Sequence, residues 1–262
     1  MKIIRICFVV AMLMAASCAT VKNYPLVKDG KAVSAIIVKN NAPNPVKFSA
    51  KELARFLAKL SAGEAVKIGD KAEPGLYNIY LGTIADKDLV RTAGIDAGRL
   101  EAEGFAISAG RGGLYIIGAD SHGIIYGTYE ILKKYGGVRW LYPGDEGEYF
   151  TVRKTIAVPG QLAYTNPYLQ VRNAQVGASS MDDLLWSIRN NASFAMALAK
   201  RNKEFKVQCD EIGCVICDAF GYGHILGPLV LGEDRKKPGT VEKLFSEHPE
   251  YFPLIDGQRK LV

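Results

Sequence analysis

The stretch GADSHGIIYGTYEILKKYGGVRWLYPG, residues 118–144, decides the fold of this chain. It follows a short apolar run, Leu114–Ile117, which is typical of a buried strand. Asp120 and Ser121 are residue types that cap the N-terminus of a helix. The pattern therefore predicts a strand followed by a helix over about residues 122–135.

The same stretch predicts how that helix ends and why it contains a glycine. Gly136-Gly137 is suited to end a helix, and Val138–Leu141 is expected to return as a strand. Gly127 costs about 1 kcal/mol inside a helix. We expect it to permit close approach of the helix to a sheet.

The residues before this stretch complete a recognisable order of elements. Glycine-separated apolar runs on either side of residues 110–113 predict a hairpin. Upstream lie a strand at Val33–Val38, a helix opened by Asn44-Pro45 and ended by Gly63, and a strand at Tyr77–Leu81. The order β-α-β-β-α-β predicts an α/β domain, an α+β sandwich whose mixed sheet carries its helices on one face.

The first residues have the pattern of an export signal. Lys2 and Arg5 precede an apolar run, Ile6–Ala16, that is too short to span a bilayer comfortably. Small residues then precede Cys18, as in a bacterial lipobox. We therefore predict a signal peptide over residues 1–17, lipidation at Cys18, and a lipid anchor in the cell envelope, with the outer membrane of a Gram-negative bacterium as the expected location and a periplasmic or secreted protein as the alternative.

The charge composition bears on which classes of partner the chain can bind. The formal net charge is +6, from 33 basic and 27 acidic side chains, without a dense Lys/Arg patch. This balance gives little support to nucleic-acid binding. We also expect no metal and no cofactor.

A resemblance to known enzymes rests on spaced residues after Glu103. These are Gly104-Phe105, Gly118-Ala119-Asp120, Gly123 with Tyr126-Gly127, and Gly137-Val138-Arg139-Trp140. The run resembles the N-terminal domain that precedes the catalytic barrel in α-glucuronidases of glycoside hydrolase family 67, and a similar domain precedes the barrel of family 20 β-N-acetylhexosaminidases. The resemblance implies an α/β domain over residues 33–160. The polar residues before it, 18–32, are expected to form a tether.

The later residues resemble a second family. The segments His248–Phe252 and Leu254–Arg259 look like the HPEYF-x-L-x-DGxR pattern of domain-of-unknown-function family 4838. Trp186 with Arg189-Asn190, and the pair Gly223-His224, fit that pattern as well. The resemblance implies that residues 161–262 begin a (β/α)8-barrel-like domain, incomplete because a full barrel needs on the order of 250 residues.

Candidate sugar-binding residues follow from the resemblance to α-glucuronidases and hexosaminidases. Tyr168–Val171 is expected to form the first barrel strand, with Arg172 and Asn173 at the end that faces a barrel's active site. In the enzymes resembled, an arginine at this position contacts the sugar. The alternative for Arg172 is an ion pair at a strand end.

His224 lies in a loop that contains glycines and aromatics, and we expect it to contact sugar hydroxyls; a plain turn is the alternative. Cys209, Cys214 and Cys217 with His224 have the ligand count of a Cys₃His zinc site, but the spacing matches no common module. A disulfide and buried thiols are the favoured alternatives in an exported chain.

His122 is expected to be solvated or to cap its helix. Asp145, Glu146 and Glu148 are expected to form a solvated loop.

Two functions remain open from sequence. The first is the N-terminal portion of an exported glycoside hydrolase-like protein that degrades polysaccharides, including glucuronate-bearing ones. Its catalytic carboxylates cannot be assigned here, and this chain alone is expected to be inactive. The alternative is a non-catalytic surface lipoprotein that binds glycans or has a structural role.

Overall fold

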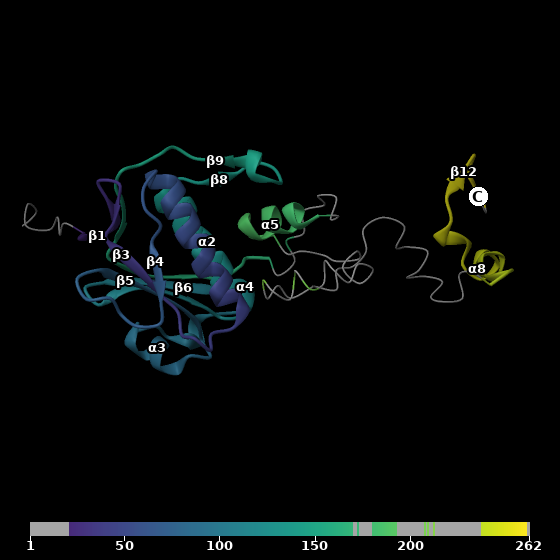
Figure 1. Cartoon of the computed structure of the whole chain (residues 1–262). Helices are drawn as coiled ribbons and strands as arrows, with labels where there is room; N and C mark the ends of the chain where they lie inside the picture. Colours follow the sequence, from purple (N-terminus) through teal and green to yellow (C-terminus); the bar gives the residue numbers. More distant parts are fainter. Residues whose placement is uncertain are drawn as a thin grey trace, which may run out of the picture. The chain divides into compact units, whose positions relative to one another are not determined.

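The computed structural model describes residues 21–169, 172, 180–192, 207, 209, 212 and 237–260. The chain divides into two units, residues 1–217 and residues 218–262. The first unit contains a mixed sheet with helices on both faces, and the second contains a short helix and a hairpin (Figure 1). Each unit is described by itself below.

The main sheet of the first unit has six strands. Their order is β11 (Gln161–Thr165), β6 (Phe105–Gly110), β7 (Gly113–Gly118), β5 (Tyr77–Thr83), β3 (Ser34–Ile37) and β4 (Lys67–Gly69). Strands β7, β5, β3 and β4 run parallel to one another, whereas β6 is antiparallel to both of its neighbours. The predicted hairpin is confirmed, with Gly110 opposite Gly113.

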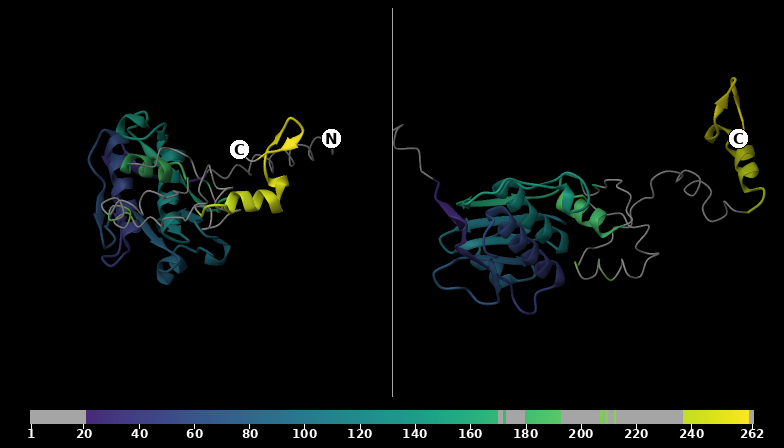
Figure 2. Two further views of the ribbon diagram at one scale, coloured as in Figure 1. Left: turned by 90° about the vertical axis from the view of Figure 1, so that its right-hand side faces the viewer. Right: turned by 45° about the horizontal axis from the view of Figure 1, so that its top comes forward.

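Helices cover both faces of this sheet, and the prediction that they lie on one face is wrong. Helices α2 (Asn44–Ser61) and α4 (Ser121–Ile131) lie against each other on one face (Figure 2). On the other face α3 (Lys87–Thr92) packs against side chains of β6 and β7. The reason is visible in β7, whose six residues are all buried, as expected of a strand covered on both sides.

The ends of α2 differ from the prediction in detail. The N-cap is Pro43, and Ala62 rather than a glycine takes the left-handed conformation at the C-terminus, with φ of 48°. Gly63 serves close approach instead, since a Cβ there would lie 2.0 Å from the carbonyl oxygen of Gly30. A side chain at position 63 would therefore push two backbone segments apart.

Helix α4 confirms the predicted role of Gly127. A Cβ at this position would lie 2.9 Å from Cγ2 of Ile116 and 3.1 Å from Cγ of Phe105. Asp120 is the N-cap, and its Oδ1 accepts a hydrogen bond of 2.9 Å from the Gly123 amide. The helix continues as a π-helical turn, η2 (Leu132–Gly136), and ends at Gly137 with φ of 77°.

The segment predicted as a tether is partly folded. Strand β1 (Asn23–Lys28) lies between β10 (Ile156–Pro159) and β2 (Lys31–Ala32) in a three-stranded sheet. Leu26 and Val27 are buried in the main core. The polar residues at both ends of β1 conceal this apolar centre in the sequence.

The predicted boundary at residue 160 also falls too early. Strand β11 lies beyond it and pairs along its length with β6, so the α/β domain extends at least to Thr165. Tyr168 and Leu169 are not in a strand, and Tyr168 is 99% exposed. The predicted barrel stays a prediction.

Short elements complete the described residues. Strands β8 (Arg139–Trp140) and β9 (Glu148–Tyr149) form a separate pair, with η3 (Asp145–Gly147) between them. Helix α5 (Met181–Arg189) begins after Ser180, whose side chain accepts a hydrogen bond from the Asp183 amide. In the second unit α8 (Thr240–Glu247) and η5 (Pro249–Tyr251) precede the hairpin of β12 (Leu254–Ile255) and β13 (Gln258–Arg259).

Candidate functional site

Arg172, the main residue predicted to contact sugar, is engaged with the α/β domain. Its Nη2 donates to Oε2 of Glu103 and forms an ion pair with that carboxylate. Nε donates to the Asn191 carbonyl over 2.7 Å, and Nη1 donates to the Leu169 carbonyl over 2.5 Å. The guanidinium also lies over the Tyr126 ring, 5.5 Å from its centroid. Arg172 therefore links the segment after β11 to the α/β domain.

Glu103 is the acceptor at the centre of this cluster, and it was not singled out from sequence. Its other oxygen, Oε1, lies 3.0 Å from Nδ1 of His122. Burial alone would raise the pKa of Glu103, but the hydrogen bonds and charges of His122 and Arg172 outweigh it, so the pKa lies below its usual value. His122 is 6% exposed, which corrects the prediction of a solvated or capping residue.

Close backbone contacts place Glu103 beside His122. A Cβ at Gly123 would lie 2.1 Å from the Gly104 carbonyl oxygen. That carbonyl accepts a hydrogen bond from the Ala119 amide over 2.8 Å, and Asp120 Oδ2 accepts one from the Glu103 amide over 2.7 Å. The first turn of α4 and the loop before β6 are thereby held together. The glycines noted in sequence were the available signal for this contact, although they do not reveal the glutamate.

A second cluster of charges is buried between α2, β9 and α5. Arg189 of α5 donates to Glu52 Oε2 over 3.1 Å and lies 3.4 Å from Glu148 Oε1. Arg55 contacts the same two carboxylates, each over 2.9 Å, and Lys59 lies 2.6 Å from Glu148 Oε2. The side chains of Arg189 and Glu148 are 6% and 2% exposed. We call these five residues the buried ion network.

The electrostatics of this network favour the charged forms. Burial would raise the pKa of Glu52, yet the positive charges of Arg189 and Arg55 hold it below its usual value. Tyr129 donates to Glu52 Oε2 over 2.8 Å, and burial raises the pKa of this phenol well above its usual value. Glu52 lies on the apolar face of α2, and a charged residue at such a position is the feature of the sequence that indicates this cluster.

Helix α5 also docks through aromatic and amide groups. Trp186 Nε1 and Asn190 Nδ2 both donate to the carbonyl of Trp140, over 3.1 and 3.0 Å. Leu184 and Ile188 are buried in the main core. The residues that carried the second resemblance, Trp186 and Arg189-Asn190, are thus those that attach α5 to the α/β domain.

The acidic run after β8 is not uniformly a solvated loop. The side chain of Asp145 is 83% exposed and Glu146 is exposed, as predicted. Glu148 instead turns inward and accepts from Arg55 and Lys59. Its charge is therefore compensated within the buried ion network.

Several predicted residues lie outside the described part of the chain. They are Cys18, Asn173, Cys214, Cys217 and His224, and their proposed roles stay predictions. Cys209 is described and is buried.

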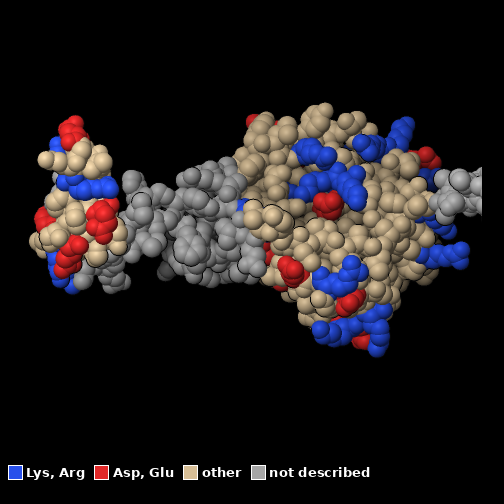
Figure 3. Space-filling model, turned by 180° about the vertical axis from the view of Figure 1, so that it is seen from behind, with Lys and Arg blue, Asp and Glu red and all other residues tan. Residues whose placement is uncertain are grey.

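The described residues contain no group of three or more His, Cys, Asp or Glu side chains placed to hold a metal ion. None of their helices is both long and apolar enough to cross a membrane. On the face shown in Figure 3, basic side chains lie beside acidic ones rather than in a single-sign stripe.

Comparison with known proteins finds a family model that matches part of the α/β domain. Residues 19–131 match the family model described as the glycosyl hydrolase family 67 N-terminus. No curated protein sequence matches the chain.

Solved structures give a related result. A family GH115 4-O-methyl-α-glucuronidase with specificity for decorated arabinogalactans is similar with a TM-score of 0.57 and 17% identity, over 90% of this chain and 35% of that one. A GH20 β-N-acetylhexosaminidase from Streptomyces coelicolor shows 16% identity over 59% of this chain and 26% of that one. Its TM-score of 0.39 is too low to indicate a shared fold. This chain therefore spans about a third of the length of the GH115 protein. The resemblance predicted from sequence is confirmed for residues 19–131, which match the N-terminal domain of glycosyl hydrolase family 67.

Proposed function

We propose that this chain is the N-terminal part of an exported glycoside hydrolase-like protein that degrades glycans. In it, the α/β domain is a non-catalytic mount for the segment that follows. The observation that carries the proposal is the match of residues 19–131 to the family 67 N-terminus, on a domain with a mixed sheet and helices.

The geometry supports the mounting role. Two separate ionic contacts join later residues to the domain: Arg172 to Glu103, and Arg189 to the buried ion network. Both arginines come from residues after the main sheet is complete. An enzyme that builds its site on such a segment needs it held within a fraction of an ångström of its working position.

The substrate part of the proposal rests on resemblance. The enzymes that the sequence resembles are α-glucuronidases, and the similar GH115 protein is named as a 4-O-methyl-α-glucuronidase. We therefore place glucuronate-bearing glycans first among the substrates of the whole protein. Glycosidases of this kind work with two carboxylates at fixed separation; Glu52, Glu103 and Glu148 are each neutralised by arginine and are not candidates for that pair.

The test is product release by the purified 262-residue chain. Aldouronic acids and neutral aryl glycosides are incubated with the chain and with a heat-inactivated sample, and released sugar is measured. We expect no release above the inactivated sample. Release that persists after removal of contaminating activities would overturn the non-catalytic role.

A further inference from the structure

A crevice lies at one edge of the main sheet, where the parallel strands β3 and β5 end. It has a volume of about 460 Å³ and is lined by the loop after β3 and the loop after β5. One wall is formed by Lys39 and residues 41–43, and the other by residues 82–83 and 85–88. The lining also contains two buried apolar side chains, Val46 and Leu81. The volume is within the range of about 300–1,000 Å³ that is usual for small-molecule sites.

The topology explains why a crevice forms here. Strands β3 and β5 are adjacent and parallel, so their carboxyl ends meet at the same edge. The chain leaves β3 toward α2 on one face of the sheet and leaves β5 toward α3 on the other face. The two loops therefore diverge and leave a gap between the strand ends. In open α/β sheets such a switch point is where ligands bind.

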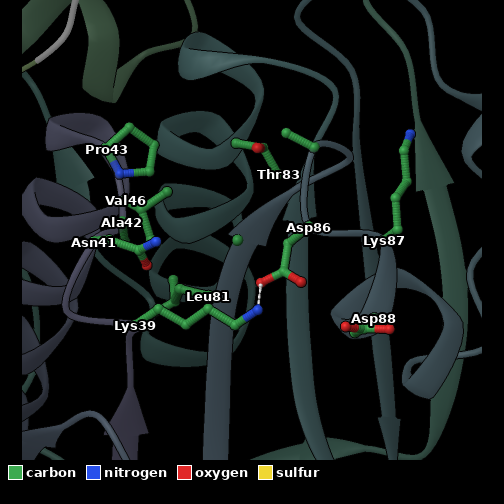
Figure 4. Close-up of a pocket in the computed structure, with 12 residues that line it drawn as sticks. Lys39, Asn41, Ala42, Pro43, Val46, Leu81, Thr83, Asp86, Lys87 and Asp88 are labelled. Atoms are coloured by element: carbon green, nitrogen blue, oxygen red, sulfur yellow. Dashed lines mark ion pairs between the residues drawn. The ribbon is translucent and has the colours of Figure 1, made fainter.

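One ion pair spans the gap. Lys39 extends from the loop after β3 toward Asp86 in the loop after β5, and Nζ lies 2.7 Å from Oδ2 (Figure 4). The Lys39 side chain is 58% exposed and that of Asp86 is 19% exposed. Separation of this ion pair costs little, because the Lys39 side chain is mostly exposed. The Lys39 ammonium and Oδ2 of Asp86 can then be redirected to a ligand, while Oδ1 of Asp86 stays bonded to the Leu89 amide.

A second hollow of about 310 Å³ continues the crevice on the other side of this pair. The two share Lys39 and Asp86, and the second adds the side chains of Tyr80 and Tyr115. These two rings are stacked, with centroids 4.8 Å apart. Apolar ring surface thus lies beside hydrogen-bonding groups, which is the combination that small-molecule sites use.

The charged side chains that line the two hollows indicate which class of ligand fits there. Around the two hollows Asp70, Asp86 and Asp88 outnumber Lys39 and Lys87. Such a balance disfavours an anion, whether phosphate or uronate. Thr83 and Asn41 add a hydroxyl and an amide, so the lining offers both hydrogen-bond donors and acceptors.

We propose that this crevice binds a neutral saccharide unit through the Lys39–Asp86 pair and the neighbouring polar groups. Neutral sugars present paired hydroxyls, each a donor and an acceptor, which an amine beside a carboxylate can satisfy together. The site lies on the α/β domain itself. It is independent of the proposed function, because it requires no catalytic domain.

The experiment is saturation-transfer NMR on the full chain with methyl glycosides of glucose, galactose, xylose and arabinose, and with methyl glucuronide as the charged counterpart. We expect at least one neutral glycoside to bind and the glucuronide to bind at least about tenfold more weakly, a difference of about 1.4 kcal/mol. Absence of binding by every neutral glycoside, or equal binding of the glucuronide, would overturn the proposal.

Variants locate the site. Asn41→Trp fills the crevice and should abolish binding, whereas Lys51→Trp, on an exposed position of α2 outside the lining, should leave it unchanged. Asp86→Asn keeps an N-cap for α3, where Asp86 accepts from the Leu89 amide, yet it removes the carboxylate. It should weaken binding without loss of fold. Binding that survives Asn41→Trp would refute this location, while the hydrolysis test above would be unaffected by either result.

Discussion

Arg189→Ala tests whether the buried ion network holds α5 on the α/β domain. The substitution removes a guanidinium that faces two carboxylates at 3.1 and 3.4 Å, in a site where its own side chain is 6% exposed. Loss of one partner from a buried pair costs about 3–5 kcal/mol, because it leaves a charge uncompensated. Arg55 still contacts both glutamates, so we expect the lower end, about 3 kcal/mol.

The assay is urea denaturation followed by tryptophan fluorescence. Both tryptophans of the chain, Trp140 and Trp186, lie in the contact between α5 and the domain, so the signal reports on this contact. The matched control is Arg91→Ala, whose ion pair with Asp88 is 81% and 78% exposed. That control should cost less than about 1 kcal/mol.

If Arg189→Ala lowers the free energy of unfolding no more than Arg91→Ala does, the buried ion network does not stabilise the domain. A change in the denaturant slope alone would indicate a change in exposed surface rather than in stability.

Three further predictions concern other parts of the chain. Gly123→Ala should destabilise the fold by about 1–3 kcal/mol, because its Cβ would lie 2.1 Å from the Gly104 carbonyl oxygen. Gly110→Ala is the control and should cost less, because there is open space around Gly110. Thermal denaturation compares the two variants, and equal midpoints would contradict the close contact at Gly123. The pKa of Glu103 is lowered in the folded chain below the usual value for a glutamate, about 4.3, so its stabilising charge is fully present above that pH and is lost as pH falls through the folded pKa. Glu103→Gln should therefore make stability less dependent on pH in the acid range below that usual pKa, and an unchanged pH profile from acid denaturation would refute this. Cys18→Ala should abolish incorporation of labelled palmitate in a Gram-negative host, and continued labelling would exclude Cys18 as the lipidation site.

Sequence predicted the α/β domain well because its signals are local. Helix α4 is bounded by Asp120 and Gly137, and Gly127 marks its approach to the sheet. The hairpin at Gly110–Gly113 follows from its turn residues. In each case the residues that determine the structure lie within one element or one turn.

The candidate site was less predictable because it depends on contacts distant in sequence. Arg172 was identified, but its partner Glu103 is 69 residues away, and no local pattern links them. Glu52 and Arg189 are separated by 137 residues. Strand β1 was missed for a different reason, since its buried pair Leu26-Val27 is too short to give a periodic signal.

Amide hydrogen exchange in α5 tests whether the α/β domain holds the segment after it. We expect slow exchange in the unaltered chain and faster exchange in α5 after Arg189→Ala or Arg172→Ala, while the amides of β7 remain protected in all three. The β7 amides serve as the internal reference against global unfolding. Exchange in α5 that is the same in all three proteins would contradict the claim.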